Sequence, residues 1–296
     1  MRRSDGRGRD RATPAPARAW TPARGYLGMV LLPCAFLGVF FLWPLVVVAQ
    51  RAFFEPTFGL QAFTTIFSHS YYTNVLSYTV RVAVSVTLLC LLIGYPVATV
   101  VARTRGRLLH LCLALILIPF WTSVVIRAYA WLVLFQRRGV INRILMDFGL
   151  VQAPLPLMHN DVGVQIGMVQ VLLPFMILPL LSAFRNMDTT LLRAAEVLGA
   201  GPVRVFIHVY VPLSMPGVSA GVVLVFITAL GFFVTPALLG GEKNMTVAVL
   251  IQWEVQRLLN WPVASALATL LLVLTIAFYL VYERFARRAG AAGVLG

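Results

Sequence analysis

Residues 188–212 read DTTLLRAAEVLGAGPVRVFIHVYVP, a stretch with four charges that lies between two long uncharged apolar runs. The pattern predicts a helix, a glycine break and a second helix. Asp188 is a favourable N-cap, and Gly199 stands where the left-handed residue that follows a helix is expected. Pro202 suits the first turn of the second helix, because the N–H that it lacks would have no partner there. On pattern alone, the stretch is a surface connector between two membrane-spanning helices.

Apolar side chains at helical spacing mark one face of each predicted helix. They are Leu191, Ala195 and Leu198 in the first, and Val203, Phe206, Ile207 and Tyr210 in the second.

The composition of the whole chain is that of a membrane protein. Of its 296 residues, 60% are hydrophobic and only 11% are charged, which excludes an ordinary soluble protein. The net charge of +14 does not indicate nucleic-acid binding, because most basic residues lie in the first 24 positions or just outside apolar runs. The three cysteines all lie within apolar runs and are expected to be buried thiols, with no metal bound.

Six apolar runs are long enough to cross a bilayer, and helices are required because bare backbone amides cannot be left in lipid. The sequence therefore predicts an all-α membrane protein with six transmembrane helices. The spans are expected at about residues 26–49, 78–102, 108–133, 162–184, 212–240 and 262–284. Residues 185–211 then form the connection between spans four and five, within a six-span domain over residues 26–288. Residues 1–25 are expected to be a disordered basic tail, and 289–296 a short C-terminal tail.

The arginines predict the orientation. With both termini in the cytoplasm, sixteen basic residues face that side and six face the other, as the positive-inside rule requires. This orientation places residues 188–212 in the cytoplasm. On the outer side, residues 58–74 form an amphipathic segment that either lies on the membrane surface or packs on neighbouring spans. Residues 137–161 and 242–261 are expected to be outer loops.

The opening stretch also carries a family resemblance. Ala194-Ala195, Gly199 four residues later, and the closing Val209-x-Val211-Pro212 resemble the cytoplasmic loop signature of permease subunits of binding-protein-dependent ABC importers. That family begins its loop with Glu-Ala-Ala, whereas Arg193 stands at the glutamate position here and Glu196 follows one turn later.

A second resemblance concerns the branch of the family. The run PFWTSVVIRAYAW at residues 119–131 resembles the spermidine/putrescine-type permeases, as do Gly94-Tyr95-Pro96, Gly240-Gly241 and Trp261-Pro262. A cluster of Trp and Tyr at the end of a span is equally typical of an interfacial aromatic belt.

The resemblance implies two groups of functional residues. The loop that contacts the ATPase would comprise Asp188, Leu191, Arg193, Ala194, Ala195, Glu196, Leu198, Gly199 and Pro212. Candidates for the translocation pathway are Trp121, Arg127, Tyr129, Trp131, Phe232 and Phe233.

The resemblance also implies an assembly in the bacterial inner membrane. A second, homologous permease would complete the pathway as the partner in a heterodimer, and an extracytoplasmic substrate-binding protein would deliver the solute. Two cytoplasmic ATPase subunits would use ATP, so this chain would bind no cofactor and would not be an enzyme. The sequence itself contains neither a phosphate-binding loop nor a catalytic or metal-binding motif.

Three alternatives follow from the residues. The missing acidic residues in the spans disfavour an ion-coupled carrier or channel. The lack of paired acids and bases disfavours a membrane enzyme. A polyamine is the solute expected from the resemblance, and another small organic solute, such as an amino-acid derivative, is the alternative.

Overall fold

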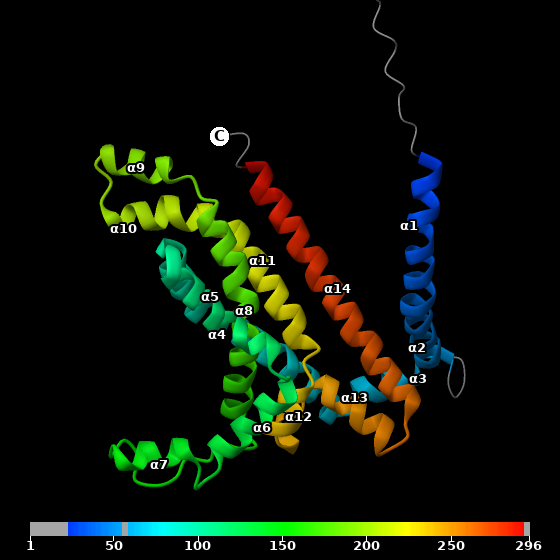
Figure 1. Ribbon diagram of the computed structural model, residues 1–296. Coiled ribbons are helices and arrows are strands. Elements are labelled where there is room, and N and C mark those ends of the chain that lie inside the picture. Colours follow the sequence, from blue (N-terminus) through cyan, green and yellow to red (C-terminus); the bar gives the residue numbers. More distant parts are fainter. Residues whose placement is uncertain (1–22, 55–58, 293–296) are drawn as a thin grey trace, which may run out of the picture. The chain divides into compact units, whose positions relative to one another are not determined.

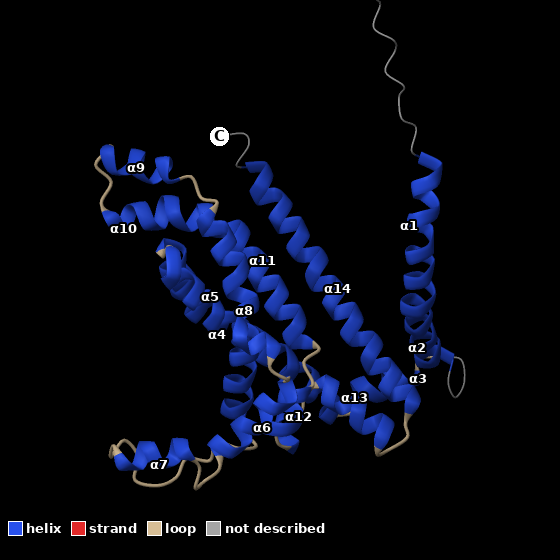
Figure 2. Cartoon of the chain, viewed as in Figure 1, coloured by secondary structure: helices blue, strands red, loops and turns tan. Residues whose placement is uncertain are grey.

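The computed structural model describes residues 23–54 and 59–292, with side chains over 29–54 and 59–284. Within these ranges every regular element is a helix, as Figure 2 shows. Most of the predicted N-terminal tail lies outside the described residues, and the last helix extends through Ala292 into the predicted C-terminal tail. The all-α prediction is confirmed.

The N-terminal unit ends at Val47 and holds most of the first span, which runs on to Phe54. Helix α1 (Ala23–Leu37) continues through the π-helical turn η1 (Gly38–Leu42) into α2 (Trp43–Phe54). The widened turn comes just before Pro44, which has no N–H to donate and whose ring crowds the carbonyl four residues earlier. The turn thus accommodates the proline without ending the helix.

Three spans form the core of the second unit: α4 (Ser70–Arg103), α8 (Asp161–Arg185) and α11 (Val211–Leu230). Figure 1 shows α8 and α11 side by side. Their facing side chains are fully buried, among them Val86, Cys90, Leu172, Met176, Leu180, Val225 and Leu230.

Glycines let these helices approach closely. A Cβ on Gly217 would lie 2.5 Å from the Cβ of Ala183, and a Cβ on Gly221 would lie 2.6 Å from the Sδ of Met176. Both glycines therefore face α8, where small residues allow helix backbones to pack at short distance.

The third span differs from the single helix expected over 108–133. Helix α5 (Gly106–Trp121) stops, and the chain bends by 96° before α6 (Val124–Phe135) and α7 (Val140–Asp147). Pro119 has no N–H to donate to the carbonyl of the preceding turn. The carbonyl of Pro119 itself accepts a hydrogen bond from the side-chain hydroxyl of Thr122, at 2.9 Å. The last turn of α5 is thereby closed by a side chain, and the helix ends.

The fifth span is also displaced from its expected range of 212–240. A continuous helix runs from Pro202 to Leu230 through α10 (Pro202–Val205), the π-turn η2 (Phe206–Tyr210) and α11. It ends at Gly231, and the chain resumes as the short helix α12 (Val234–Leu239). Pro236 explains the break, because its ring would clash with the carbonyl four residues earlier in an uninterrupted helix.

The structure has up to six membrane spans among its described residues, if α5 and the bent segment after it are counted together as one span. Among the described residues, five helices are long and apolar enough to cross a membrane, and the pair formed by α5 and the segment 124–147 is the sixth candidate. The last span is α14 (Trp261–Ala292).

Short helices lie in the connections before α4 and before α14. These are α3 (Gln61–Ser68), the 3₁₀ turn η3 (Glu242–Asn244) and α13 (Val247–Gln256), the last two within the segment 242–261 expected to be a loop. Ile66 of α3 is fully buried in a cluster with Leu250 and Leu267. Where the structure describes the segment expected at 58–74, α3 therefore packs on neighbouring helices, although Phe67 is exposed.

Candidate functional site

Asp188 caps the N-terminus of α9 (Thr189–Val197). Its Oδ1 accepts hydrogen bonds from the backbone N–H of Thr190, at 2.9 Å, and from the Thr190 hydroxyl, at 2.7 Å. Because both bonds favour the ionised carboxylate, the pKa of Asp188 lies below its ordinary value. The N-cap predicted at this position is confirmed.

Gly199 ends the same helix in the left-handed conformation, with φ of +80°. Its N–H donates to the carbonyl of Glu196 at 2.9 Å, and the N–H of Ala200 donates to the carbonyl of Ala195 at 3.0 Å. These two bonds are the Schellman arrangement, which satisfies carbonyls that the helix itself leaves free. A side chain at Gly199 would meet no neighbour, so the requirement for glycine is set by the backbone alone.

The chain then reverses, and α10 runs back beside α9, as Figure 1 shows. Pro202 occupies the first turn of α10, as predicted. Pro212 lies in the first turn of α11, inside the continuous helix. The N–H of Val211 donates to the carbonyl of Phe206, which defines the wide π-turn just before this proline.

The apolar stripe predicted on α9 is not covered by the rest of the chain. Leu191 is 48% exposed and Leu198 is 87% exposed. Val203 and Ile207 on the returning helix are more than half exposed. Exposed apolar side chains of this kind are typical of a surface that contacts another protein or the membrane.

The other residues of the predicted loop lie on the same helix. Arg193, Ala194 and Glu196 are exposed, and Ala195 is half-buried. Arg193 and Glu196 are three residues apart, so both charges lie near one face of α9.

An aromatic cluster joins this segment to the spans. The ring of Tyr210 stacks on Phe184 with centroids 5.1 Å apart and on Phe206 at 5.7 Å. Tyr95 of α4 meets Phe184 and Phe206 edge to face, at 5.2 and 6.3 Å. Its hydroxyl lies 3.1 Å from the Oγ of Ser214, within hydrogen-bond distance. The four rings therefore connect η2 with α4 and α8.

Sequence reasoning did not identify this cluster. In the sequence, Tyr95 is marked only by the Gly94-Tyr95-Pro96 resemblance, and the four rings come from segments that are up to 115 residues apart. Helical spacing identified Phe206 and Tyr210 as members of one stripe, but it gives no information on which other helix the stripe meets.

The candidate pathway residues fall into two environments. Trp131 stacks on Phe135 at 4.8 Å and, like Phe232, packs against the main core. Trp121 and Tyr129, by contrast, are 90% and 55% exposed. Arg127 is half-buried, and its Nε has no hydrogen-bond partner. The pathway role of these residues, and that of Phe233, stays a prediction.

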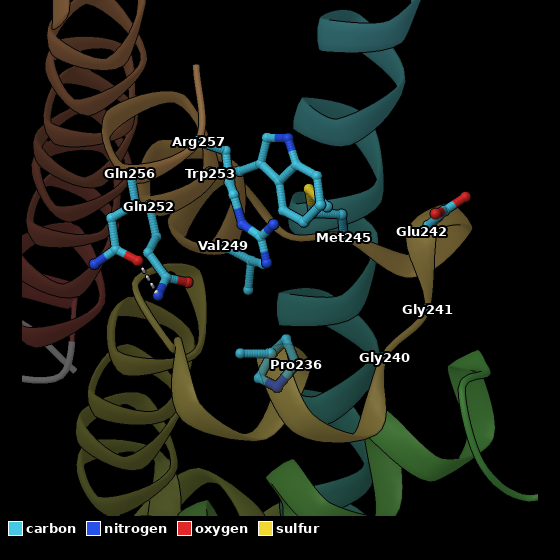
Figure 3. A pocket seen from close by; sticks show the side chains of 11 residues that line it. Pro236, Gly240, Gly241, Glu242, Met245, Val249, Gln252, Trp253, Gln256 and Arg257 are labelled. Atoms are coloured by element: carbon cyan, nitrogen blue, oxygen red, sulfur yellow. Dashed lines mark hydrogen bonds between the residues drawn. The ribbon is translucent and has the colours of Figure 1, made fainter. Parts of the chain in front are cut away.

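A cavity of about 370 Å³ opens between α12, η3 and α13. Figure 3 shows Trp253 and Met245 on one wall, with the guanidinium of Arg257 between Trp253 and the paired glutamines. Arg257 lies over the Trp253 ring at 5.2 Å, and Gln252 donates to Gln256 at 3.0 Å. The cavity thus combines an aromatic face, a cation and amide groups.

A buried acid near this cavity was also missed. Glu254 of α13 is 1% exposed, its Oε1 accepts a hydrogen bond from the Tyr72 hydroxyl at 2.8 Å, and its Oε2 has no partner. Farther along α4, the hydroxyl of Thr79 accepts a hydrogen bond from the N–H of Val247 at 2.9 Å. Two polar contacts therefore fix α13 on α4. An acidic residue in a short segment between two apolar runs gave no sequence signal of burial.

Comparison with known proteins identifies the family. The family described as "Binding-protein-dependent transport system inner membrane component" matches residues 91–290. The chain is 35% identical over 238 residues to the spermidine/putrescine transport system permease protein PotB of Escherichia coli (strain K12), covering 80% of this chain and 86% of that protein. It is 42% identical over 198 residues to PotB of Haemophilus influenzae, covering 67% of this chain and 69% of that protein.

A solved structure shares the fold. The bacterial alginate ABC transporter in complex with an alginate pentasaccharide-bound periplasmic protein matches with a TM-score of 0.72 at 20% identity, covering 92% of this chain and 98% of that chain. The helical arrangement, the capped helix pair α9–α10 and these matches all indicate the same family. The chain belongs to the inner-membrane components of binding-protein-dependent transport systems, the permease subunits of ABC importers.

Proposed function

We propose that this permease imports polyamines of the spermidine and putrescine type. The observation that carries the proposal is its identity of 35% to the E. coli spermidine/putrescine permease over 80% of the chain. The motifs at residues 94–96 and 119–131 lie inside the range that supports it.

Membership of the family establishes the general role and location of the chain. The chain is a non-catalytic, multi-pass subunit of the inner membrane, and ATP hydrolysis takes place on a separate subunit. The rival classes considered above, an ion-coupled carrier and a membrane enzyme, are therefore not favoured.

In the proposed assembly, two cytoplasmic ATPases bind α9 and its homologue on a second permease, with which this chain forms a heterodimer. An extracytoplasmic binding protein delivers the solute, and both termini are cytoplasmic. The exposed apolar side chains of Leu191 and Leu198 support an ATPase contact at α9, because this chain leaves them uncovered. The arginine bias supports the orientation. The chain itself needs no cofactor.

Coupling would pass through the aromatic cluster. Closure of the ATPases on ATP would move α9 and α10 together, since the Schellman end at Gly199 fixes the turn between them. The stack of Phe206 and Tyr210 on Phe184 would carry that motion to α8, and Tyr95 would carry it to α4. The spans would then alternate between inward-facing and outward-facing states.

A polyamine is a polycation, so its path through the membrane requires groups that attract ammonium ions. Trp121, Tyr129 and Trp131 offer aromatic faces, which attract ammonium groups. The described part of this chain places no carboxylate among these rings, so the second permease or the binding protein would supply the acid. The binding protein would accordingly carry out most of the selection.

Uptake in cells that carry the complete system tests the proposal. Labelled putrescine and spermidine should accumulate, and unlabelled polyamines should compete, whereas amino acids should not. A strain that lacks only this permease is the matched control and should accumulate neither. Competition by an amino-acid derivative without competition by polyamines would assign the permease to another solute.

A further inference from the structure

The hairpin that follows the bent third span, residues 136–157, projects as a rigid arm. Asn142 on α7 is fully buried, and its Nδ2 donates to the carbonyls of Gln136 and Leu155 at 3.1 and 3.0 Å. Its Oδ1 accepts a hydrogen bond from the N–H of Leu155 at 2.8 Å. One side chain therefore joins both ends of the arm.

Backbone hydrogen bonds also fix the C-terminal end of α7. Gly149 adopts φ of +67°, and its N–H donates to the carbonyl of Met146 at 2.9 Å. The N–H of Leu150 donates to the carbonyl of Leu145 at 2.9 Å, which completes a Schellman end. The exposed side chains of the arm are therefore held in place by its backbone.

Exposed apolar residues form one stripe along this helix. Val140, Ile144 and Phe148 are 53%, 47% and 78% exposed, and they recur every four residues. At 3.6 residues per turn, the three lie within about 80° of arc. The neighbouring arc on one side holds Ile141, which packs against the core, and the arc on the other side holds Arg143 and Asp147, both exposed. The uncovered apolar stripe thus lies between a packed face and a charged face.

The bend gives the direction of the arm. Helix α5 is apolar from Leu111 to Trp121 and has no buried residue, although Phe120 packs on Phe175 of α8. Most of its surface is therefore open, which suits a helix in contact with lipid. The segment 124–147 departs from α5 at 96°. If α5 crosses the bilayer close to the normal, this segment runs close to the membrane plane, at the surface where α5 ends.

We propose that α7 lies in the membrane interface and inserts Val140, Ile144 and Phe148 into the lipid of that leaflet. Interfacial helices have this arrangement, with aliphatic and aromatic residues towards the acyl chains and arginines at the headgroups. Arg137 and Arg138 at the start of the arm and Arg143 on its charged face are exposed and can reach lipid phosphates. The arm would add a lipid contact to the second half of the bent span, where α6 already packs on α8 and α12.

Site-directed spin labelling of the complete transporter in nanodiscs of phosphatidylethanolamine and phosphatidylglycerol tests the proposal. Cys34, Cys90 and Cys112 are replaced by alanine, and single labels are placed by Ile144→Cys and Phe148→Cys. Asp147→Cys, on the charged face, is the matched aqueous control. Leu115→Cys, 63% exposed on α5, is the lipid control.

The ratio of oxygen to nickel-chelate collisions reports the depth of each label. Labels at 144 and 148 should lie about 5–10 Å below the headgroup boundary. Their ratios should approach that of the label at 115, and the label at 147 should have the low ratio of an aqueous site. Equal ratios at 144, 147 and 148 would overturn the proposal. Shielding of 144 and 148 from both reagents would also overturn it, since a protein partner would then cover the stripe. The measurement does not depend on the solute, so its outcome is separate from that of the uptake test.

Discussion

The ring of Tyr95 on α4 meets the ring of Phe184 on α8 edge to face, with centroids 5.2 Å apart and planes at 82°. The contact lies at the base of the helix pair that we assign to the ATPase. It gives the exposed segment a direct mechanical connection to two spans of the core.

Replacing Tyr95 by alanine should therefore uncouple transport. Each aromatic pair contributes about 0.5–1.5 kcal/mol, so losing the contacts of this ring should lower uptake per ATP hydrolysed by roughly tenfold or more. Tyr95→Phe keeps the rings in contact and removes only the hydroxyl at Ser214, so it should retain most of the uptake. Uptake and ATPase rate are measured together in proteoliposomes. Equal coupling in the wild type and Tyr95→Ala would exclude the cluster from force transfer.

Gly199→Val should leave the chain in the membrane but abolish coupled uptake. Its φ of +80° costs a residue with a Cβ about 1–2 kcal/mol, and the strain would disturb the turn between α9 and α10. Gly201→Ala is the control, because Gly201 has φ of −65° and open space around it. Full uptake by Gly199→Val would refute the assignment of residues 188–212 to coupling.

Gly217→Leu should destabilise the core of the membrane domain. A Cβ there would lie 2.5 Å from the Cβ of Ala183, so α8 and α11 would have to separate. Overpacking of this kind costs about 1–3 kcal/mol. Gly231→Ala, with open space at the end of α11, should have little effect. Thermal unfolding of the purified complex compares the two, and an unchanged Tm for Gly217→Leu would contradict the close packing.

Tyr72→Phe should destabilise the contact between α4 and α13. It leaves both carboxyl oxygens of Glu254 without a protein partner, and a buried polar group left unsatisfied costs about 1–3 kcal/mol. Tyr71→Phe is the matched control, since the Tyr71 hydroxyl contacts only the Sδ of Met245, at 3.5 Å. Combining Tyr72→Phe with Glu254→Leu should recover part of the lost Tm. A Tyr72→Phe variant as stable as Tyr71→Phe would show that the bond contributes nothing.

The cap at Asp188 predicts a pH dependence. Because the pKa of Asp188 is lowered from 3.8 by its bonds to Thr190, capping is fully present above pH 3.8 and is lost as the pH falls through the lowered value. Amide exchange of α9 should therefore show constant capping between pH 5 and 8, after correction for the intrinsic rate. At neutral pH, Asp188→Ala should accelerate exchange and Asp188→Asn should not. Equal exchange in both variants would show that the cap does not hold the helix.

The sequence was sufficient for what depends on local pattern. Apolar runs located five helices that are long enough to cross a membrane and the bent pair that is the sixth candidate. Capping rules placed Asp188, Gly199 and Pro202 at the ends of two helices where the structure has them. Runs of apolar residues could not locate the breaks at Thr122 and Gly231, because lipid-compatible residues continue through both. Pro119 and Pro236 were visible in the sequence, but a proline can either widen a turn or end a helix.

Contacts between distant segments were beyond local pattern. The burial of Glu254 depends on α3, α4 and α14 closing around the short helix α13, and the aromatic cluster depends on three helices meeting at one level. The exposed stripe on α9 is a second example. Its spacing predicted an apolar face, but spacing alone could not tell whether this chain covers that face, and the structure leaves it open.

The π-turn at Phe206–Tyr210 has one further consequence. A π-turn accommodates an additional residue within an α-helix, so it changes the rotational register of everything on one side relative to the other. Deleting one residue within 206–210 would rotate α10 and its exposed side chains by about 100° about the axis of α11. If α9 and α10 contact the ATPase as proposed, the direction in which they face it is set by the number of residues in this one turn and not by the chemistry of those residues.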